Sequence, residues 1–322
     1  METSLSQREF ENKVRETALP PEVSKLAAEY DTQIGIRDEY LWKWMAQLLP
    51  SFQLPCVPAE HVDAANRQKL LLTMYITTID DIVEYSGDKE TFEQARKIPF
   101  PSRDVDGSGS SVDTETLVFA ARVWERLEKQ LTDAPRYDEF EDVFHFDIRQ
   151  ALNAMEYSLL VSRYPAIANE TGTTQYDSHN MVMFGYSDID LMYAPNFDLG
   201  DLSTLRSTLW KTQRLARIGN WLTTWERELH EGDYSSGVVV AAIREGIIDV
   251  TELAEGLSPS EISTITDRIK ESEIEERLYN EWDQTYTQLL ETAFETESID
   301  LNEFIRGMKT VFEYHINSKG SK

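Results

Sequence analysis

The chain has 322 residues, of which 41% are hydrophobic and 11% aromatic, enough to build a sizeable core and to line an apolar pocket. Its 31 basic and 58 acidic residues give a net charge of −27, which repels nucleic acids and anionic membranes and argues against both as partners. The lone Cys56 cannot form an internal disulfide, and no metal-binding spacing occurs among the five histidines, so we expect a reducing, cytoplasmic location.

The acidic excess has two explanations that the composition does not separate. Adaptation to high salt would produce it, because salt screens the repulsion while charge keeps the protein soluble; an ordinary acidic protein is the alternative. Residues 1–15 are polar and charged, which does not fit a secretory signal, and no segment reaches the roughly 18 apolar residues of a membrane span. With no linker in the sequence, we expect one domain over residues 1–322 and no stable membrane insertion.

Sparse glycine and proline, together with little apolar alternation, predict an all-α fold. The first helix signal is Pro20-Pro21, since proline is favoured in a first helical turn. Asp38 to Leu49 has the pattern of an amphipathic helix that Pro50 ends. A longer helix is predicted from Ala59 to Tyr85, mostly apolar and therefore buried.

The stretch from Ile98 to Asp113 is rich in proline, glycine and serine, so we expect a loop. Five of its positions and the next helix also match a calcium-binding loop if serine is allowed: Asp104, Asp106, Ser108, Gly109 and Glu115. Such a loop needs a helix leading into it, which Pro99 and Pro101 prevent, so we interpret Asp113 as the cap of a helix from Thr114 to Leu131.

The rest of the chain carries further helical patterns. They cover Tyr137 to Val161, Asp177 to Tyr193, Leu202 to His230, Ser235 to Arg244 and a last group between Ser258 and Ser318. Short breaks separate them, as expected for a helical bundle.

Two helical stretches, 140 residues apart, can present oxygen ligands to divalent cations. In the first, Asp80 and Glu84 are four residues apart and project from one helix face, with Asp81 rotated about 100° from it. In the second, one face carries Asn220, Thr224 and Glu228. Both stretches sit within apolar sequence, where an unpartnered acid or amide would be costly. Two such faces across a cleft would form a site for several Mg²⁺ ions and the phosphates they bridge.

The two motifs resemble those of the class I terpene synthases of microbial type. Asp80, Asp81 and Glu84 match the family's DDxx(D/E) motif. Asn220, Thr224 and Glu228 match its (N/D)DxxSxxxE motif, with threonine for serine and Trp221 where aspartate is frequent. The resemblance extends from the helix before Asp80 to the C-terminus. It implies an all-α, single-domain bundle around a central cavity.

The resemblance also implies a mechanism and a ligand set. Three Mg²⁺ ions held by Asp80, Asp81, Glu84, Asn220, Thr224 and Glu228 would bind a prenyl diphosphate and stabilise the departing diphosphate. Arg227, just before the last glutamate, would bond a phosphate oxygen. An aromatic-lined cavity would stabilise the carbocation, and its expected wall residues are Tyr75, Thr77, Phe184 and Trp221, with Tyr186 and Thr73 as further candidates.

The chain departs from the family where the diphosphate is sensed. Many bacterial members have an arginine upstream of the second motif, but Thr173 to Met181 contains none. His179 and Asn180 lie near that place and can donate hydrogen bonds to phosphate. Many members also end in an Arg-Tyr pair, whereas this chain has Glu313-Tyr314. Tyr314 would then act alone, helped by Arg214 or Arg217.

Three functions therefore stay open at this point. The first is a terpene cyclase that acts on farnesyl or geranylgeranyl diphosphate and yields a sesquiterpene or diterpene. The second is a trans-prenyltransferase, although that family carries two aspartate-rich motifs. The third is a catalytically silent helical protein that binds partners on the same fold. A homodimer through a shared apolar helix face is one alternative for the oligomeric state.

Overall fold

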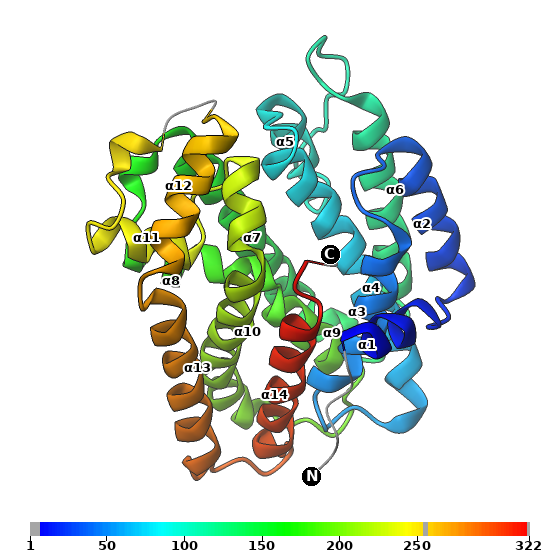
Figure 1. The fold of residues 1–322 in the computed structure, drawn as a ribbon. Coiled ribbons are helices and arrows are strands. Elements are labelled where there is room, and N and C mark those ends of the chain that lie inside the picture. Colours follow the sequence, from blue (N-terminus) through cyan, green and yellow to red (C-terminus); the bar gives the residue numbers. More distant parts are fainter. Residues whose placement is uncertain (1–6, 254–256, 321–322) are drawn as a thin grey trace.

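The computed structural model describes residues 7–253 and 257–320, and over these residues it contains helices and no strand. Figure 1 shows how these helices pack side by side in one bundle. The α-helices are α1 (Gln7–Arg15), α2 (Pro21–Gln33), α3 (Glu39–Leu48), α4 (Ala59–Glu84), α5 (Lys89–Ala95), α6 (Thr114–Leu131), α7 (Tyr137–Arg163), α8 (Glu170–Gln175), α9 (Met183–Met192), α10 (Leu202–Glu231), α11 (Gly237–Arg244), α12 (Pro259–Lys270), α13 (Ile274–Glu291) and α14 (Leu301–Asn317). Short 3₁₀ turns are η1 (Leu49–Phe52), η2 (Pro165–Ile167), η3 (Asp177–Met181), η4 (Leu199–Asp201) and η5 (Val250–Glu252).

Side chains cap some of the predicted helices, among them α3 and α6. Asp38 accepts a hydrogen bond from the Tyr40 backbone N–H, and Asp113 accepts from the first turn of α6. The prediction that residues 98–113 form a loop ended by the Asp113 cap is confirmed. Within this loop, Asp106 accepts from the backbone and hydroxyl of Ser108, which is the bonding of a local turn.

Three features differ from the predicted helix pattern. The chain from Asp177 to Tyr193 is a 3₁₀ turn followed by α9, separated at Val182, whose φ of 55° is left-handed. Helix α3 ends at Leu48, just before Pro50 as predicted, but the chain continues directly into a 3₁₀ turn, η1, whose first turn contains Pro50. The short helices α1, α5 and α8 were not predicted, since they hold few apolar repeats.

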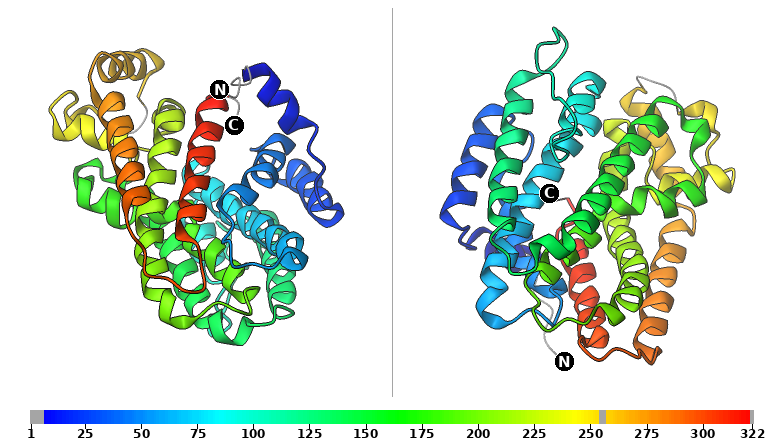
Figure 2. Two further views of the ribbon diagram at one scale, coloured as in Figure 1. Left: turned by 90° about the horizontal axis from the view of Figure 1, so that it is seen from below. Right: turned by 180° about the vertical axis from the view of Figure 1, so that it is seen from behind.

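Two long helices, α4 and α10, organise the molecule. Helix α4 packs against α6, α7, α3 and α9, while α10 packs against α14, α13, α11 and α9. The two views in Figure 2 show α4 and α10 on different sides of the centre, with α9 and α14 nearby. Each predicted motif lies in the C-terminal part of its helix, so the packing decides whether the two motifs meet. Among the helices of the described ranges, none combines the length and apolar character that a membrane crossing requires.

Candidate active site

One pocket of about 180 Å³ lies between α3, α4, α10, α14 and the η3–α9 segment, and both motifs contribute to its wall. Its polar part contains Arg37, Asp80, Glu84, Asn180, Arg217, Asn220, Thr224, Arg227 and Glu228. The remaining lining residues are Leu41, Trp44, Met45, Leu48, Phe52, Thr73, Ile76, Thr77, Met181, Val182, Met183, Tyr186, Ala216, Val311 and His315. The pocket therefore joins a charged end to an apolar end.

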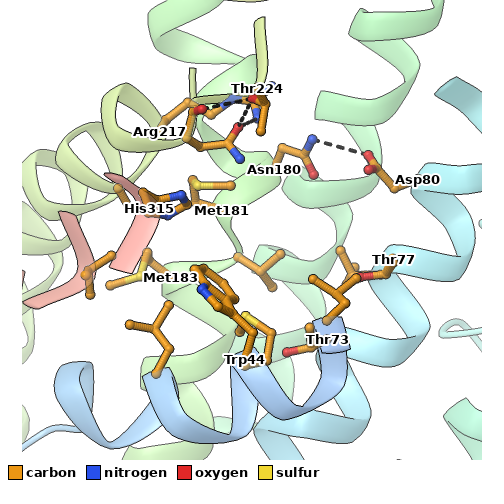
Figure 3. A pocket seen from close by; sticks show the side chains of 18 of the residues that line it. Trp44, Thr73, Thr77, Asp80, Asn180, Met181, Met183, Arg217, Thr224 and His315 are labelled. Carbon is orange, nitrogen blue, oxygen red and sulfur yellow. Dashed lines mark hydrogen bonds between the residues drawn. The ribbon is translucent and has the colours of Figure 1, made fainter. Parts of the chain in front are cut away.

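The charged end brings together the predicted ligands of both helices. Figure 3 shows Asp80 on one side of the pocket and Thr224 on the other, with Asn180 between them. The Asn180 side-chain amide donates to Asp80 Oδ1 at 3.3 Å, which links the η3 turn to the first motif. Glu84 lies close enough to Glu228 for the two charges to affect each other. Of the predicted ligands, only Asp81 lies outside the wall of this pocket, among the described residues.

The carboxyl groups at this end bind protons more tightly than usual. Burial raises the pKa of Asp80 to about 6, and the charge of Asp81 adds to the effect. Burial also raises the pKa of Glu228 to about 7, although Arg217 opposes the rise. The pKa of Glu84 lies well above its ordinary value because of burial and the nearby carboxylates. Bound protons or added cations can therefore relieve the cost of burying these carboxyl groups.

Buried oxygens without a hydrogen-bond partner indicate whether divalent cations would fit at this end of the pocket. Glu228 Oε2 and Asp233 Oδ2 are buried and have no hydrogen-bond partner among the described residues. Within those residues, no group of three or more histidine, cysteine, aspartate or glutamate side chains is arranged to hold a metal ion. The donors are two carboxylates on one wall and one carboxylate, an amide and a hydroxyl on the other. This set fits Mg²⁺, which takes most of its ligands from water and substrate oxygens.

Asp81 does not line the pocket and instead accepts hydrogen bonds from two neighbouring side chains. It is 1% exposed, accepts from Arg37 Nε at 2.8 Å through Oδ1, and accepts the Tyr30 hydroxyl through Oδ2. The rotation of about 100° per residue turns it away from the face of Asp80 and Glu84. Its effect on the pocket is indirect, because it fixes Arg37, which does line the wall.

Arg217 is the most buried cation of the charged end, with 3% of its side chain exposed. Its Nε and Nη2 donate to the two carboxylate oxygens of Asp177, both at 2.7 Å. Its Nη1 donates to Asn220 Oδ1 at 2.6 Å. The pKa of Arg217 is raised by Asp177, Glu228 and Glu84 against the opposing effect of burial, so the guanidinium is a permanent charge here.

The apolar end is formed by large side chains with a few polar groups. Thr73 and Tyr186 share a hydrogen bond of 2.8 Å between their hydroxyls, so neither group is left unpaired in the wall. Tyr186 also packs against Phe52, with ring centroids 5.4 Å apart. Figure 3 shows Met181 beside His315 and Met183 above Trp44. Methionine adapts to irregular shapes, which suits a wall around a flexible apolar ligand.

Three residues expected in the cavity wall lie elsewhere. Tyr75, five residues before Asp80, points away from it and donates to the Ala95 carbonyl at 3.0 Å. Phe184 lies under Arg206, with the guanidinium carbon 4.8 Å from the ring centre. Trp221 is buried behind the site and donates to Asp177 Oδ2 at 3.2 Å. In each case the helical rotation from a true wall residue explains the misplacement.

Among the expected diphosphate ligands, Arg227, Asn180 and Arg217 line the pocket, whereas Tyr314 and His179 do not. The Tyr314 hydroxyl donates to Gln47 Oε1 at 3.2 Å, and its neighbour His315 takes the wall position. His179 is buried and packs against Trp210, with the two ring centroids 4.8 Å apart.

Arg214, named as a helper, lies outside this pocket and pairs with Glu281 at 3.0 Å. It lines a second cavity together with residues of α8, α11 and α13. The sequence offered both Arg214 and Arg217, and only the fold distinguishes them.

Sequence reasoning missed several wall residues. Arg37 and Trp44 line the pocket but lie far from both motifs in the chain, and no pattern marked them. Asp177 and Asp233 lie outside the pocket wall, where Asp177 pairs with Arg217 and Asp233 raises the pKa of Glu228. Val182 carried a signal only in three dimensions, since a β-branched residue at positive φ is strained and such residues gather at functional sites.

No protein-family model matches the chain, and a search of curated proteins finds no match either.

Proposed function

We propose that this protein is a Mg²⁺-dependent terpene cyclase of class I that ionises farnesyl or geranylgeranyl diphosphate and cyclises the resulting cation. The observation that carries the proposal is the shared pocket of two carboxylate-bearing helix faces, Asp80/Glu84 and Asn220/Thr224/Glu228, joined to an apolar end. Raised pKa values at Asp80 and Glu228 support it, because a site with this excess of acid favours added cations.

The reaction divides between the two ends of the pocket. At the charged end, the C1–O bond of the allylic diphosphate breaks, and the oxygen keeps the electron pair. Bound Mg²⁺ would neutralise the charge on the leaving diphosphate. Arg227 and Arg217 can donate hydrogen bonds to the same oxygens. The products are a cyclic hydrocarbon, diphosphate and the proton that the last cation releases. If that cation captures water instead, loss of a proton from the captured water gives an alcohol.

The apolar end has to fold the chain and exclude water until the cation is quenched. Trp44, Phe52 and Tyr186 present aromatic rings at this end, and a π face attracts a cation without reacting as a strong nucleophile. The paired hydroxyls of Thr73 and Tyr186 are less free to attack the cation than unpaired ones. The methionines complete a wall that adapts to several chain conformations.

The test is to incubate the purified protein with each diphosphate, with Mg²⁺ or with EDTA, at low and high salt, and to identify extracted products by mass spectrometry. We expect a cyclic product that requires Mg²⁺ and is lost in Asp80→Asn. Asp63→Asn is the matched control, since Asp63 is an exposed acid on the same helix. Elongated prenyl diphosphates in place of cyclic products would point to the prenyltransferase. If no product forms and diphosphate shows no Mg²⁺-dependent binding, the hypothesis of an enzyme is overturned and that of a helical binding protein remains.

A further inference from the structure

The second cavity lies between α8, α10, α11 and α13, on the side of the molecule opposite α2 and α6 (Figure 1). Its volume of about 250 Å³ leaves room for a molecule much larger than one water. Three guanidinium groups and two carboxylates line it, a local surplus of positive charge in a chain whose net charge is −27. The lining residues are Glu170, Thr173, Arg214, Gly237, Val240, Ala241, Arg244, Arg277, Leu278 and Glu281.

Arg214 is the least exposed of the three arginines, with 17% of its side chain exposed against 52% for Arg244 and 45% for Arg277. Its Nε and Nη2 donate to Glu281 at 3.0 and 3.4 Å, and its guanidinium carbon lies 4.6 Å from the centre of the Trp221 ring. The remaining terminal nitrogen, Nη1, is buried and has no hydrogen-bond partner among the described residues. Ion pairing and stacking therefore hold Arg214 in place, and an added acceptor would relieve the cost of its unpaired N–H groups.

The two outer arginines share one carboxylate oxygen. Arg244 donates to Glu170 Oε2 at 2.7 Å and to Glu245 Oε1 at 2.9 Å. Arg277 donates to the same oxygen of Glu245, which lies outside the cavity wall. One carboxylate does not neutralise two guanidinium charges, so these arginines can still attract an anion.

Three guanidinium groups suit a phosphate group better than a carboxylate. A carboxylate offers two oxygens, which one guanidinium fork can bind, whereas a phosphate monoester offers three terminal oxygens to donors on several sides. The rest of the wall is largely apolar, with Val240 and Ala241 on α11 and Leu278 on α13. A ligand with a short apolar group would bury that group against these side chains.

We propose that the second cavity is a binding site for a small organic phosphate. Arg214, Arg244 and Arg277 bind the phosphate oxygens, and a short alkyl group packs against the apolar part of the wall. The site does not depend on the proposed function, because no residue that lines it also lines the candidate active site. Failure of the cyclase test therefore leaves this proposal to be decided by its own experiment.

The test is calorimetry with n-butyl phosphate in the presence of EDTA, on the unmodified protein and on Arg277→Gln. We expect saturable binding at one site, weakened at least tenfold in the variant, the range of one charge-assisted hydrogen bond. Arg306→Gln is the matched control, since Arg306 is an exposed arginine of α14 outside the cavity. It removes the same charge from the protein and should leave the affinity unchanged. Equal weakening in both variants would reveal a non-specific charge effect and overturn the proposal.

Ala241→Phe tests the cavity itself, because it fills the space beside α11 and changes no charged residue. We expect it to abolish binding while urea unfolding stays cooperative. Inorganic phosphate should bind the unmodified protein more weakly than n-butyl phosphate, and equal affinities would overturn the role of the apolar wall.

Two further outcomes would overturn the whole site. The first is that the unmodified protein binds no n-butyl phosphate, or binds it as tightly as Arg277→Gln and Ala241→Phe do. The second is that binding is lost in Arg227→Gln and kept in Arg277→Gln, which would place the anion in the candidate active site.

Discussion

Two groups of buried charges in this molecule differ in their balance. The first is the pair of Lys69 and Asp190, both fully buried, joined at 2.6 Å and completed by the Leu54 N–H at 2.9 Å. The second is a carboxylate cluster: Asp80, Glu84 and Glu228 in the pocket wall, and Asp233, outside the wall, whose charge acts on Glu84 and Glu228. The pair holds one charge of each sign, although burial raises the pKa of Asp190 too and its Oδ1 has no hydrogen-bond partner among the described residues. In the cluster, neighbouring carboxylates add to the effect of burial and raise the pKa values of Asp80 and Glu228 further.

The difference separates a structural role from a functional one. A balanced buried pair needs no added cation, and the loss of one partner is strongly destabilising because it leaves an uncompensated buried charge. A cluster with surplus acid stays protonated or draws cations from solution. The substitutions below should therefore act on stability in the pair and on metal binding in the cluster.

The largest effect on stability is expected for Lys69→Met. It leaves the Asp190 charge buried with only the Leu54 N–H, which costs about 3–5 kcal/mol. Urea unfolding measures the loss, and Mg²⁺ should not restore it. In the double variant Lys69→Met/Asp190→Asn the charge is gone but the acceptor for Leu54 stays, so most of the stability should return. Equal stability of the single and double variants would contradict the structural role.

Glu228→Gln should impair metal binding and leave the stability of the protein intact, the opposite of Lys69→Met. Without metal, the variant should unfold at the same or a higher urea concentration at pH 8, because it removes a charge that burial and Asp233 disfavour. The stabilisation that Mg²⁺ and diphosphate confer should be lost, and product formation should fall about 100-fold. A metal-free variant as unstable as Lys69→Met would show that Glu228 is a structural acid.

The same distinction should appear within one motif, at neighbouring aspartates. Asp81→Asn weakens the bonds to Arg37 and Tyr30 and should cost about 2 kcal/mol of unfolding free energy, with a smaller change in Mg²⁺ affinity. Asp80→Asn should weaken Mg²⁺ binding more and stability less. Parallel urea and calorimetric titrations of both variants compare the two, and equal effects on Mg²⁺ affinity would mean that Asp81 is also a metal ligand.

The all-α fold and most helix starts could be predicted because their signals are local. Asp38, Asp113 and the prolines mark helix starts within a few residues of chain, and the i, i+4 spacing assigns Asp80 and Glu84 to one face. The rotation of about 100° per residue also correctly predicted that Asp81 lies off that face. Such signals need no knowledge of which helices touch.

The rest of the site depended on packing that one sequence does not reveal. Tyr75, Phe184 and Trp221 are aromatic and close to true wall residues in the chain, but a rotation of one to five residues sends each to another interface. Arg37 and Asp177 enter the site through side-chain pairs with partners 44 and 40 residues away. Only the tertiary arrangement brings these partners together.

The smallest and most gradual effect is the pH dependence of metal binding. The pKa of Asp80 is about 6 and that of Glu228 about 7, so Mg²⁺ must displace protons below these values, and its affinity should rise with pH between 6 and 8. The affinity should change by up to about tenfold per pH unit for each proton displaced. Calorimetry in two buffers of different ionisation enthalpy counts the released protons.

The stability of the metal-free protein should show the opposite trend. Because the folded pKa values lie above the unfolded ones, the folded state holds more protons, and this contribution to stability is full at low pH and lost as pH rises through 6 and 7. Asp233, after α10, raises the pKa of Glu228, and Glu84 on α4 interacts with the same carboxyl group. The guanidinium groups of Arg217 and Arg227 lower the pKa of Glu228. Glu228→Gln removes one titrating group. The stability of this variant should therefore fall less steeply between pH 6 and 8 than that of the unmodified protein. An identical slope in both would mean that Glu228 is already ionised in the folded protein and that the cluster lacks the surplus of acid from which its role was inferred.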